Sequence, residues 1–539
     1  MEKLQGTVLK SMLVSGANAL ANQYQAIDAL NVFPVPDGDT GTNMNLTFSS
    51  GVKDIVEYRS EHVGDICKVL SKGLLMGARG NSGVILSQIF RGFYQGVEGQ
   101  DEIDALTFAK AFVKGSEIAY KAVMRPVEGT ILTVIRESST HTLHYAQQEN
   151  STDILAVIDK LVEEAKISLA KTPELLPVLK EVGVVDSGGA GLLKILEGFQ
   201  AALHGNPIAL QEGSSIEHAA GAAMESDEFG YCTEFIVRLN PNTNTAFSED
   251  KLKKQLARIG ESIVVVQDDD IVKVHVHTLM PGEALNLAQR YGEFVKLKIE
   301  NMQEQHDHLT LVQKEAAEAP KKQYGIIAVA AGEGLEQYFR ELRVDVVVSG
   351  GQTMNPSTED FVAAAKKLRA EHIFILPNNS NIVLAAQQAK DVLEELDIHV
   401  IPTKTIPQGI AACIMFNPDV DVESNLAEMN EAFGRVKTGQ VTYAIKDTTF
   451  DGLAISANDY MGIKEKEIIV SKPDKLEVTK QLIGAMVTEE AELVTLIRGE
   501  DVTAEELDEI TAYIEEHCDA ELEVIEGKQP VYSFFIGVE

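Results

Sequence analysis

The fold is decided by the stretch Asn31-Val-Phe-Pro-Val-Pro-Asp37-Gly-Asp39-Thr40-Gly41-Thr42-Asn43-Met44, which gathers carboxylates, glycines and hydroxyls where a helical apolar pattern stops. Its two prolines stiffen the approach, and its glycines permit backbone angles that other residues avoid. Asp37 and Asp39 are close enough along the chain to share one or two hard cations. The hydroxyls of Thr40 and Thr42 are suited to phosphate oxygens, as is the amino end of a helix that follows them. The pattern predicts a metal-phosphate loop, with a plain solvent turn as the alternative, because Asp-Gly-Asp is common in turns.

Charge and composition limit the classes of partner. The chain has 539 residues, enough for about three domains. Its 47 basic and 82 acidic residues give a net charge of −35, which argues against nucleic acid or an anionic membrane surface as a partner. A basic partner protein suits this charge better.

Neither targeting nor disulfide signals are present in the sequence. The start, Met-Glu-Lys-Leu-Gln-Gly, lacks a signal-peptide pattern, and no apolar run approaches the roughly 20 residues that span a bilayer. We therefore expect a cytoplasmic protein without a transmembrane segment. The four cysteines, Cys67, Cys232, Cys413 and Cys518, show no paired spacing, so a disulfide framework is not expected.

The first 205 residues show helical periodicity. The apolar residues Leu9, Met12, Leu13, Ala17 and Leu20 make one stripe, and the pattern resumes in Ile66–Leu75, Leu106–Ala122 and Ile154–Leu169. This indicates an all-helical domain over residues 1–205.

Three further glycine-rich loops interrupt these helices. They are Gly77-Ala-Arg79-Gly80-Asn81-Ser82-Gly83, Arg125-Pro-Val-Glu-Gly-Thr130 and Gly183-Val-Val-Asp186-Ser-Gly-Gly-Ala-Gly191. If they cluster at one end of a helical bundle, they form a pocket rimmed by amides and hydroxyls. Each loop alone is equally typical of a helix cap.

Together these loops resemble, in order, the nucleotide-contacting loops of the ATP-binding L subunit of dihydroxyacetone kinase. In that family a Gly-Asp-Gly-Asp-x-Gly-x-Asn-Met run binds magnesium and nucleotide phosphates, which implies ATP and two Mg²⁺ ions here, with Asp37 and Asp39 as ligands. A third aspartate of the family lies upstream, where Asn31 is the nearest comparable residue. The residues that the resemblance implies for nucleotide binding are Thr40, Gly41, Thr42, Asn43, Gly80, Asn81, Ser82, Gly83, Thr130 and Asp186.

The amino-acid sequences of these motifs and the three-domain length also resemble those of the ATP-binding subunit of bacterial fatty acid kinase. This resemblance covers essentially the whole chain. In that family a separate acyl-binding protein presents a fatty acid, and the kinase subunit transfers the ATP γ-phosphate to its carboxylate. We expect Arg79 to act with Asp37 and Asp39 in catalysis by stabilising charge on the transferred phosphoryl group, with an outward salt bridge as the alternative.

After a linker over residues 206–229, an α+β middle domain is expected over residues 230–313. His275 and His277 lie two apart on a predicted strand, so their rings leave the same face. If the strand that carries Cys232 is its neighbour, a Cys-His-His zinc site forms, with Glu234 as a further ligand or base. The alternative is half-buried polar surface. The resemblance to the fatty acid kinase subunit favours Zn²⁺.

A second linker over residues 314–322 leads to a predicted two-lobed α/β domain over residues 323–539. Continuous apolar strands alternate with helices, which indicates a parallel sheet with helices on both faces; the strands are Tyr324–Ala330, Val344–Ser349, His372–Pro377 and Ile398–Pro402. The loop 349–358 resembles a loop of the acyl-binding DegV family, and its alternative is a turn capped by Ser357 or Thr358.

The sequence therefore predicts a multidomain kinase subunit: an all-α nucleotide-binding domain, an α+β middle domain and an α/β domain that binds a DegV-family acyl carrier. The expected product is an acyl phosphate for phospholipid synthesis, and the resemblance implies a homodimer. Two alternatives remain open at this point. One is a small-polyol kinase subunit, and the other is a non-catalytic lipid-binding or regulatory protein.

Overall fold

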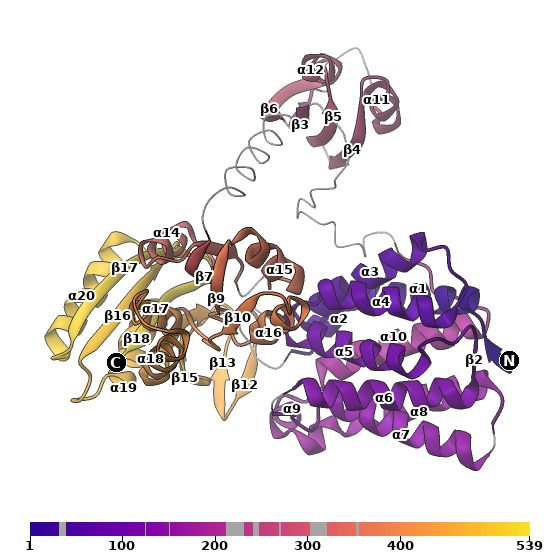
Figure 1. Cartoon of the computed structure of the whole chain (residues 1–539). Helices are drawn as coiled ribbons and strands as arrows, with labels where there is room; N and C mark the ends of the chain where they lie inside the picture. Colours follow the sequence, from indigo (N-terminus) through magenta and orange to yellow (C-terminus); the bar gives the residue numbers. More distant parts are fainter. Residues whose placement is uncertain are drawn as a thin grey trace. The chain divides into compact units, whose positions relative to one another are not determined.

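The computed structural model describes residues 1–31, 39–123, 125–149, 151–211, 231–240, 247–268, 271–301, 321–351 and 355–539. Asp37 lies outside these residues, as do most of the two expected linkers. The described residues form two compact units, one made of Met1–Glu217 with Lys321–Glu539 and the other of His218–Pro320 (Figure 1). The helical and α/β parts of the chain therefore pack as one body.

Helices make up most of the described part of residues 1–205, as predicted. A two-stranded pair, β1 (Lys3–Leu4) and β2 (Ile103–Asp104), joins the start of the chain to the middle of the bundle. The helices are α1 (Gly6–Ala21), α2 (Tyr24–Asp28), α3 (Thr40–Glu57), α4 (Val63–Met76), α5 (Gly80–Val97), α6 (Ala105–Ala122), α7 (Ile131–Gln148), α8 (Ile154–Leu175), α9 (Pro177–Val182) and α10 (Ser187–Leu203).

The stripe predicted on α1 is buried, with Leu9, Met12, Leu13 and Leu20 at most 1% exposed. It packs in one core with Phe48 of α3 and the aromatic residues of α5, α6 and α10. The rings of Phe90, Phe93, Phe108 and Phe112 pack in sequence with centroids 4.8 to 6.4 Å apart. This core holds the amino ends of α3, α5 and α10 in fixed positions.

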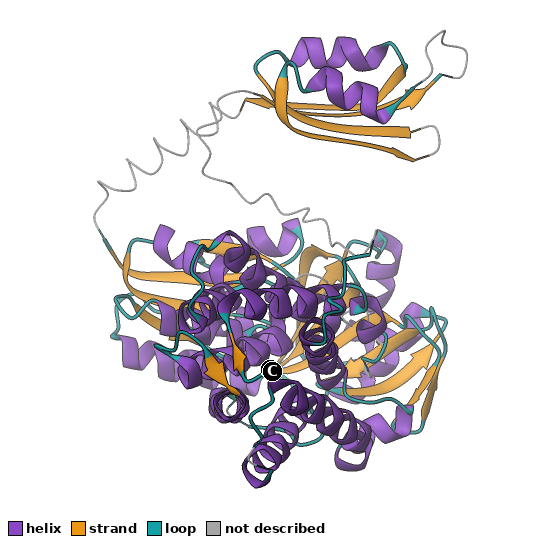
Figure 2. Cartoon of the chain, turned by 90° about the vertical axis from the view of Figure 1, so that its right-hand side faces the viewer, coloured by secondary structure: helices purple, strands orange, loops and turns teal. Residues whose placement is uncertain are grey.

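The second unit is a four-stranded antiparallel sheet with two helices on one face (Figure 2). Its strand order is β4-β5-β3-β6. Alternate residues of β5, Val272, Val274 and Val276, are buried against the helices. The elements are β3 (Tyr231–Leu239), α11 (Glu249–Leu256), β4 (Gly260–Asp268), β5 (Ile271–Thr278), α12 (Pro281–Gln289) and β6 (Gly292–Asn301).

The C-terminal part begins with the predicted parallel sheet, in the order β10-β9-β7-β8. Helices cover both faces: Ile326 and Ala328 of β7 pack in one core with α14 and α17, whereas Ile327 and Val329 pack in another with α15 and α16. Continuous burial on both faces explains why these strands read as unbroken apolar runs. The elements are β7 (Lys322–Ala330), α14 (Glu333–Glu341), β8 (Val346–Ser349), α15 (Thr358–Lys367), β9 (Ala370–Leu376), α16 (Val383–Val392), β10 (Asp397–Val400), α17 (Ile406–Ile414) and α18 (Val422–Arg435).

The second lobe has a mixed sheet, so the parallel arrangement holds only for the first. Its order is β15-β14-β11-β18-β16-β17, and only β16 and β17 pair in parallel. The elements are β11 (Lys437–Tyr443), the hairpin β12 (Thr448–Phe450) and β13 (Leu453–Ile455), β14 (Tyr460–Lys464), β15 (Glu467–Lys472), α19 (Lys475–Met486), β16 (Leu493–Gly499), α20 (Ala504–His517), β17 (Glu521–Gln529) and β18 (Tyr532–Val538).

The helical and α/β parts share a core at the start of α5. Ala78 and Val84 pack among the residues of α15 and α16. The Thr358 amide donates to the Ala78 carbonyl at 3.1 Å. Lys446 reaches back to the backbone carbonyls of Ala29 and Asn31, at 3.3 and 2.7 Å. These contacts place the carboxyl ends of the parallel strands opposite the amino ends of the helices.

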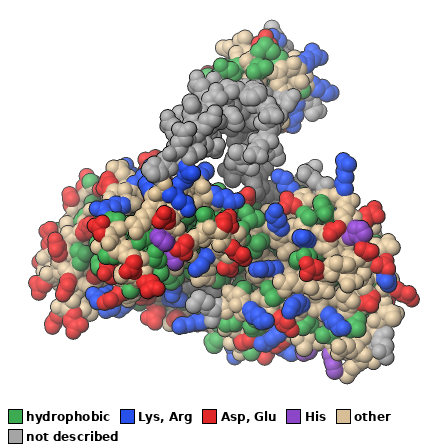
Figure 3. All heavy atoms as spheres, viewed as in Figure 1, with side chains coloured by type: hydrophobic (Ala, Val, Ile, Leu, Met, Phe, Trp, Pro, Cys, Tyr) green, Lys and Arg blue, Asp and Glu red, His purple; other side chains and the backbone are tan. Residues whose placement is uncertain are grey.

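No helix among the described residues is long and apolar enough to cross a membrane. Acidic and basic side chains are interspersed over the face shown in Figure 3.

Candidate functional site

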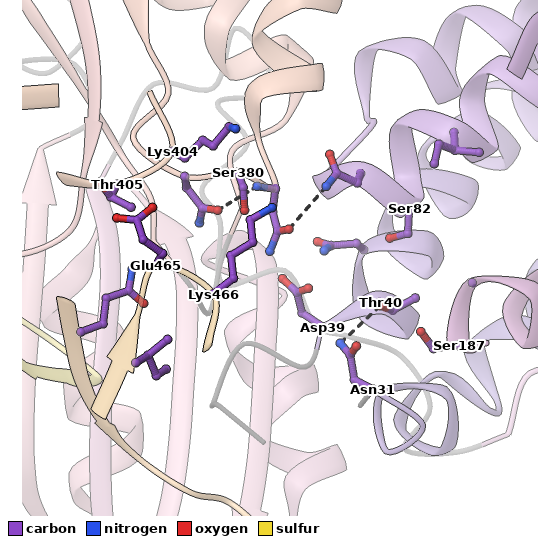
Figure 4. Close-up of a pocket in the computed structure, with 18 of the residues that line it drawn as sticks. Asn31, Asp39, Thr40, Ser82, Ser187, Ser380, Lys404, Thr405, Glu465 and Lys466 are labelled. Atoms are coloured by element: carbon purple, nitrogen blue, oxygen red, sulfur yellow. Dashed lines mark hydrogen bonds between the residues drawn. The ribbon is translucent and has the colours of Figure 1, made fainter. Parts of the chain in front are cut away.

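A pocket of about 450 Å³ lies where the helical and α/β parts meet. Figure 4 shows Asn31, Asp39, Thr40, Ser82 and Ser187 on the helical side of this space. Seven residues predicted from the sequence line it: Asn31, Asp39, Thr40, Asn43, Asn81, Ser82 and Asp186. The structure thus brings three separate loops of the sequence together.

The helical side of the pocket is built from helix amino ends. Thr40 starts α3, Asn81 and Ser82 lie in the first turn of α5, and Ser187 starts α10. Amide groups in the first turn of a helix have no partner within that helix, and the helix dipole adds positive potential there. Several such ends around one space favour an anionic ligand such as a polyphosphate.

Asp28, which the sequence analysis missed, does not line the pocket but binds the start of α3. One of its carboxylate oxygens accepts hydrogen bonds from the amides of Gly41 and Thr42 at 2.6 and 3.1 Å, and the other accepts from the Thr42 hydroxyl at 2.8 Å. Burial raises the pKa of Asp28 despite these bonds. The Gly41 and Thr42 amides, expected to face phosphate, therefore bind a carboxylate of the chain in this structure. Its position at the end of a short helix, before the loop, was the available signal.

Asp39 faces the pocket from the position before α3. Its carboxylate accepts a hydrogen bond from the side-chain amide of Asn355, which lies in the α/β part. Asn355 is 1% exposed, and its side-chain oxygen has no hydrogen-bond partner among the described residues. A buried amide oxygen next to a carboxylate fits a hard cation.

Asp186 is a partly buried carboxylate of the pocket. Its side chain caps α10 by accepting a hydrogen bond from the Gly189 amide at 2.6 Å. Burial raises its pKa to about 6, although that hydrogen bond favours the charged form. The carboxylate can therefore change its charge near neutral pH when a ligand or metal approaches.

The glycines expected along the phosphates have a packing role. Gly80 has φ of +58°, and a Cβ atom there would lie 2.6 Å from the Asn43 side-chain amide. A Cβ at Gly83 would lie 2.3 Å from the Thr47 hydroxyl. Thr130 caps α7 through the Leu132 amide at 3.4 Å. None of these three is among the described residues that line the pocket.

Arg79 contacts the α/β part of the chain. Its guanidinium donates to the Asn355 carbonyl at 2.8 Å and lies 3.7 Å from the Asp360 carboxylate. It is not among the described residues lining the pocket. Two roles were considered for Arg79, stabilisation of the phosphoryl group and a salt bridge. The contacts in this structure are those of a salt bridge, and its partner, Asp360, lies in the α/β part of the chain.

The α/β side supplies the basic groups that the sequence analysis missed. Lys404 follows β10, and Lys466 lies in the turn between β14 and β15 (Figure 4). Neither ammonium group forms an ion pair with a described residue. This side of the pocket also includes Asn379, Ser380, Asn381, Thr405, Gln408 and Glu465. These residues lie some 300 or more positions from Asp39, so no local pattern links them to it.

At the end of the loop 349–358 the structure shows the predicted helix cap, whereas the resemblance to the acyl-binding loop stays a prediction. Ser357 caps α15, with a hydrogen bond from the Asp360 amide at 3.2 Å, and the Asp360 carboxylate accepts from the Ser357 amide at 2.7 Å. The Ser357 hydroxyl is thus engaged in the capping box. Gln352, Thr353 and Met354 lie outside the described residues.

In the middle unit, β3 and β5 are neighbours, as the zinc hypothesis requires. In their antiparallel register Cys232 is opposite His277, and Glu234 is opposite His275. These side chains lie outside the described part of the structure, so the ligation itself stays a prediction.

Comparisons with known proteins assign the family. The DAK2 domain model matches residues 34–201. Models of the middle and C-terminal domains of FakA-like fatty acid kinase proteins match residues 228–309 and 325–539. Protein YloV of Bacillus subtilis (strain 168) is 48% identical over 552 residues, which cover 99% of each chain. The chain belongs to the FakA-like fatty acid kinase family.

Other relatives of this FakA-like chain show the same full-length similarity. An uncharacterized protein of Staphylococcus aureus (strain bovine RF122 / ET3-1) is 43% identical over 553 residues, with 100% of both chains covered. The DAK2 and fatty acid kinase matches place the chain among kinase-type phosphotransferases.

Two solved structures show weak similarity. A DegV family protein from Corynebacterium glutamicum is 12% identical and matches 40% of this chain and 97% of its own, with a TM-score of 0.34. The dihydroxyacetone kinase from C. freundii in complex with AMP-PNP and Mg²⁺ is 10% identical and matches 55% of this chain and 57% of its own, with a TM-score of 0.30. Both TM-scores are too low to establish a common overall fold.

Proposed function

We propose that this chain is the ATP-binding catalytic subunit of a fatty acid kinase, which transfers the γ-phosphate of ATP to a fatty acid carboxylate. The observation that carries the proposal is the pocket, because it combines helix amino ends, oxygen ligands and lysines around one space. Membership of the FakA-like fatty acid kinase family supports the choice of acceptor.

The donor set of the pocket fits a magnesium nucleotide. Asp39, with Asp37 beside it in the sequence, supplies carboxylate oxygens, and the side-chain amide of Asn31 adds a neutral oxygen. Asn355 is not among the lining residues but holds the Asp39 carboxylate by a hydrogen bond. Magnesium held there would lower the charge on the β- and γ-phosphates. The first-turn amides of α5 and α10 would hold phosphate oxygens from the other side.

Lys404 and Lys466 are proposed to face the phosphoryl group during transfer. Both line, from the α/β side, the pocket that Asp39 and Ser82 also line (Figure 4). Positive charge placed where negative charge develops stabilises the transition state more than the ground state. These lysines would take the role that the sequence analysis gave to Arg79, unless Arg79 releases Asn355 when nucleotide binds.

The reaction needs no general base. A carboxylate oxygen of the fatty acid attacks the γ-phosphorus, the bond from that phosphorus to its bridging oxygen breaks, and ADP leaves as the acyl phosphate forms. Because a carboxylate is already ionised near pH 7, no proton must be removed, and positioning with charge neutralisation can account for catalysis.

We propose that a separate DegV-family protein carries the fatty acid and presents its carboxylate as the phosphoryl acceptor. The test is hydroxylamine trapping of acyl phosphate from magnesium, ATP and oleate, with and without such a protein. Asp39→Asn is the site variant, and Asp508→Asn on the exposed face of α20 is its matched control. We expect product only with the partner present and Asp39 intact. Product from Asp39→Asn at the wild-type rate would refute the site, and ATP turnover on a small polyol instead would refute the acceptor.

We further propose a zinc ion on the middle unit, bound by Cys232, His275 and His277, in line with the register of β3 and β5. Zinc should survive dialysis of the wild-type protein and be lost from the His275→Ala/His277→Ala variant. Metal analysis showing equal zinc in both proteins would contradict this assignment. A homodimer is also proposed from the family resemblance, and light scattering of the purified chain tests it.

A further inference from the structure

Two histidines and an aspartate gather on the four-stranded parallel sheet, away from the pocket. His372 lies on β9, and Asp397 and His399 lie on the neighbouring strand β10. The parallel register places Asp397 opposite His372. Residues two apart on a strand leave the same face, so His399 shares that face with Asp397. Adjacent strands thus present three metal-binding side chains together.

The ligand atoms of this cluster are close enough to share one ion. His372 Nδ1 lies 2.6 Å from one carboxylate oxygen of Asp397, and His399 Nε2 lies 3.0 Å from the other. One atom from each of the three residues lies within 4.8 Å of the others. Atoms bonded to one zinc ion at about 2.0–2.2 Å are about 3–3.6 Å apart, so only small side-chain shifts are needed.

The position of His399 is not fully explained if the three residues form only a hydrogen-bonded cluster at the surface. Its Nε2 atom is buried and has no aligned hydrogen bond to any described residue, despite its short distance from Asp397. A buried nitrogen whose neighbouring carboxylate oxygen is poorly aligned gains little from that contact. A cation at the centre of the cluster would satisfy it.

Aromatic rings fix the orientation of both imidazoles. The Tyr324 ring centroid lies 5.5 Å from that of His372, and the Phe374 centroid lies 5.7 Å from that of His399. Tyr324 is itself held by a hydrogen bond to the Val420 carbonyl at 2.6 Å. Rings already held in place lose little freedom when they bind an ion. The Asp397 side chain is 50% exposed, so an ion can enter and keep a water ligand.

We propose that His372, Asp397 and His399 form a zinc site with water in the remaining position. Two imidazoles and a carboxylate are a donor set that Zn²⁺ and related divalent transition ions accept. His372 and Asp397 lie near the amino ends of β9 and β10, whereas Asn379 and Lys404 of the pocket follow the carboxyl ends of these strands. The ion would therefore link the outer strand β10 to β9 at the edge opposite the nucleotide pocket.

The test uses the untagged full-length chain with the His275→Ala/His277→Ala changes, so that the proposed middle-unit site does not contribute. After treatment with EDTA, Zn²⁺ is added back, unbound ion is removed and the bound metal is measured. We expect one zinc per chain, and none after the further change His372→Gln/His399→Gln. The matched control is His62→Gln/His141→Gln, because each of these surface histidines pairs with a single carboxylate at 2.7 Å. This control should keep its zinc.

Two measurements keep the result clear if a variant folds poorly. Circular dichroism in EDTA should be the same with and without the His372→Gln/His399→Gln change. Co²⁺ added to the His275→Ala/His277→Ala protein should give visible d–d absorption that Zn²⁺ abolishes. Absence of both bound zinc and this absorption overturns the proposal, as does equal zinc in the His372→Gln/His399→Gln and His62→Gln/His141→Gln proteins.

Discussion

At the scale of single residues, the pocket joins groups whose properties depend on burial rather than on sequence neighbours. Asp186 was singled out from its glycine-rich loop, but its raised pKa follows from the packing of α7 and α10 around it. Lys404 and Lys466 are ordinary surface lysines in the sequence, and only the fold brings them opposite Asp39.

Asp186 should make stability depend on pH. Its folded pKa of about 6 exceeds the ordinary value of 3.8, so the folded state binds more protons between these values. The free energy of unfolding should therefore fall as pH rises from about 4 to 6. Asp186→Asn keeps a capping group but cannot ionise. Without nucleotide, we expect this variant to exceed wild type by about 1–3 kcal/mol at pH 7.5 and to match it near pH 4, measured by urea unfolding.

Asp104 provides a control of opposite sign. It caps α6, and its hydrogen bond from the Thr107 amide lowers its pKa. Asp104→Asn should therefore cost stability at pH 7.5, and the loss should shrink as the pH falls. Similar pH trends for the two variants would contradict the burial of Asp186.

The two lysines should act on the phosphoryl group more than on nucleotide binding. Lys404→Gln or Lys466→Gln should lower kcat by about 10- to 1,000-fold, with a smaller change in KM for ATP, because the charge acts most strongly in the transition state. Lys171→Gln, at an exposed position near the end of α8, is the matched control. A rise in KM alone would show that the lysines only bind the nucleotide.

At the scale of elements, much of the architecture could be predicted from the sequence. The buried stripe on α1 and the apolar strands β7 and β9 carry their periodicity in consecutive residues. The mixed order of the second sheet could not be read in this way, because strand pairing such as that of β11 with β18 joins residues about 100 positions apart. The Gly80 loop was recognised, but its contact with α3 was not.

Substitutions at Gly80 and Gly99 should distinguish two contributions to the free energy of unfolding, one from backbone conformation and one from packing. Gly80→Ala would force a side chain into a left-handed conformation and bring its Cβ within 2.6 Å of the Asn43 amide. Gly99 has φ of +72° with nothing within 4 Å of an added Cβ, so Gly99→Ala measures the backbone cost alone, about 1 kcal/mol. We expect Gly80→Ala to cost about 1–3 kcal/mol more than Gly99→Ala in denaturant unfolding. Equal costs would show that α3 moves aside freely.

At the scale of the whole molecule, the pocket exists because the helical and α/β parts form one compact unit. Half of the site was accessible to sequence analysis, namely the helix amino ends of residues 1–205. The other half was not, because Asn355, Lys404 and Lys466 meet Asp39 only through tertiary packing.

Substitution of Asn355 should test the contact between the helical and α/β parts. Its side chain holds the Asp39 carboxylate, and its carbonyl accepts from Arg79. Asn355→Ala removes only the side-chain bond, so we expect weaker magnesium binding, with the activation curve shifted at least about threefold to higher Mg²⁺. Arg79→Lys should instead loosen the junction and lower the unfolding midpoint. An unchanged Mg²⁺ curve in Asn355→Ala would show that Asp39 needs no support from the α/β part.

The joint pocket also ties activity to the timing of synthesis. Asp39 leaves the ribosome early, but Lys404, Lys466 and Tyr532 of the same pocket follow much later, the last of them near the end of the chain. At 5–20 residues per second the interval from Asp39 to Tyr532 is about 25–100 s. With the proposed kinase function, a nascent chain that has folded its helices would still lack a complete phosphate pocket, and it would not turn over ATP before translation is nearly finished.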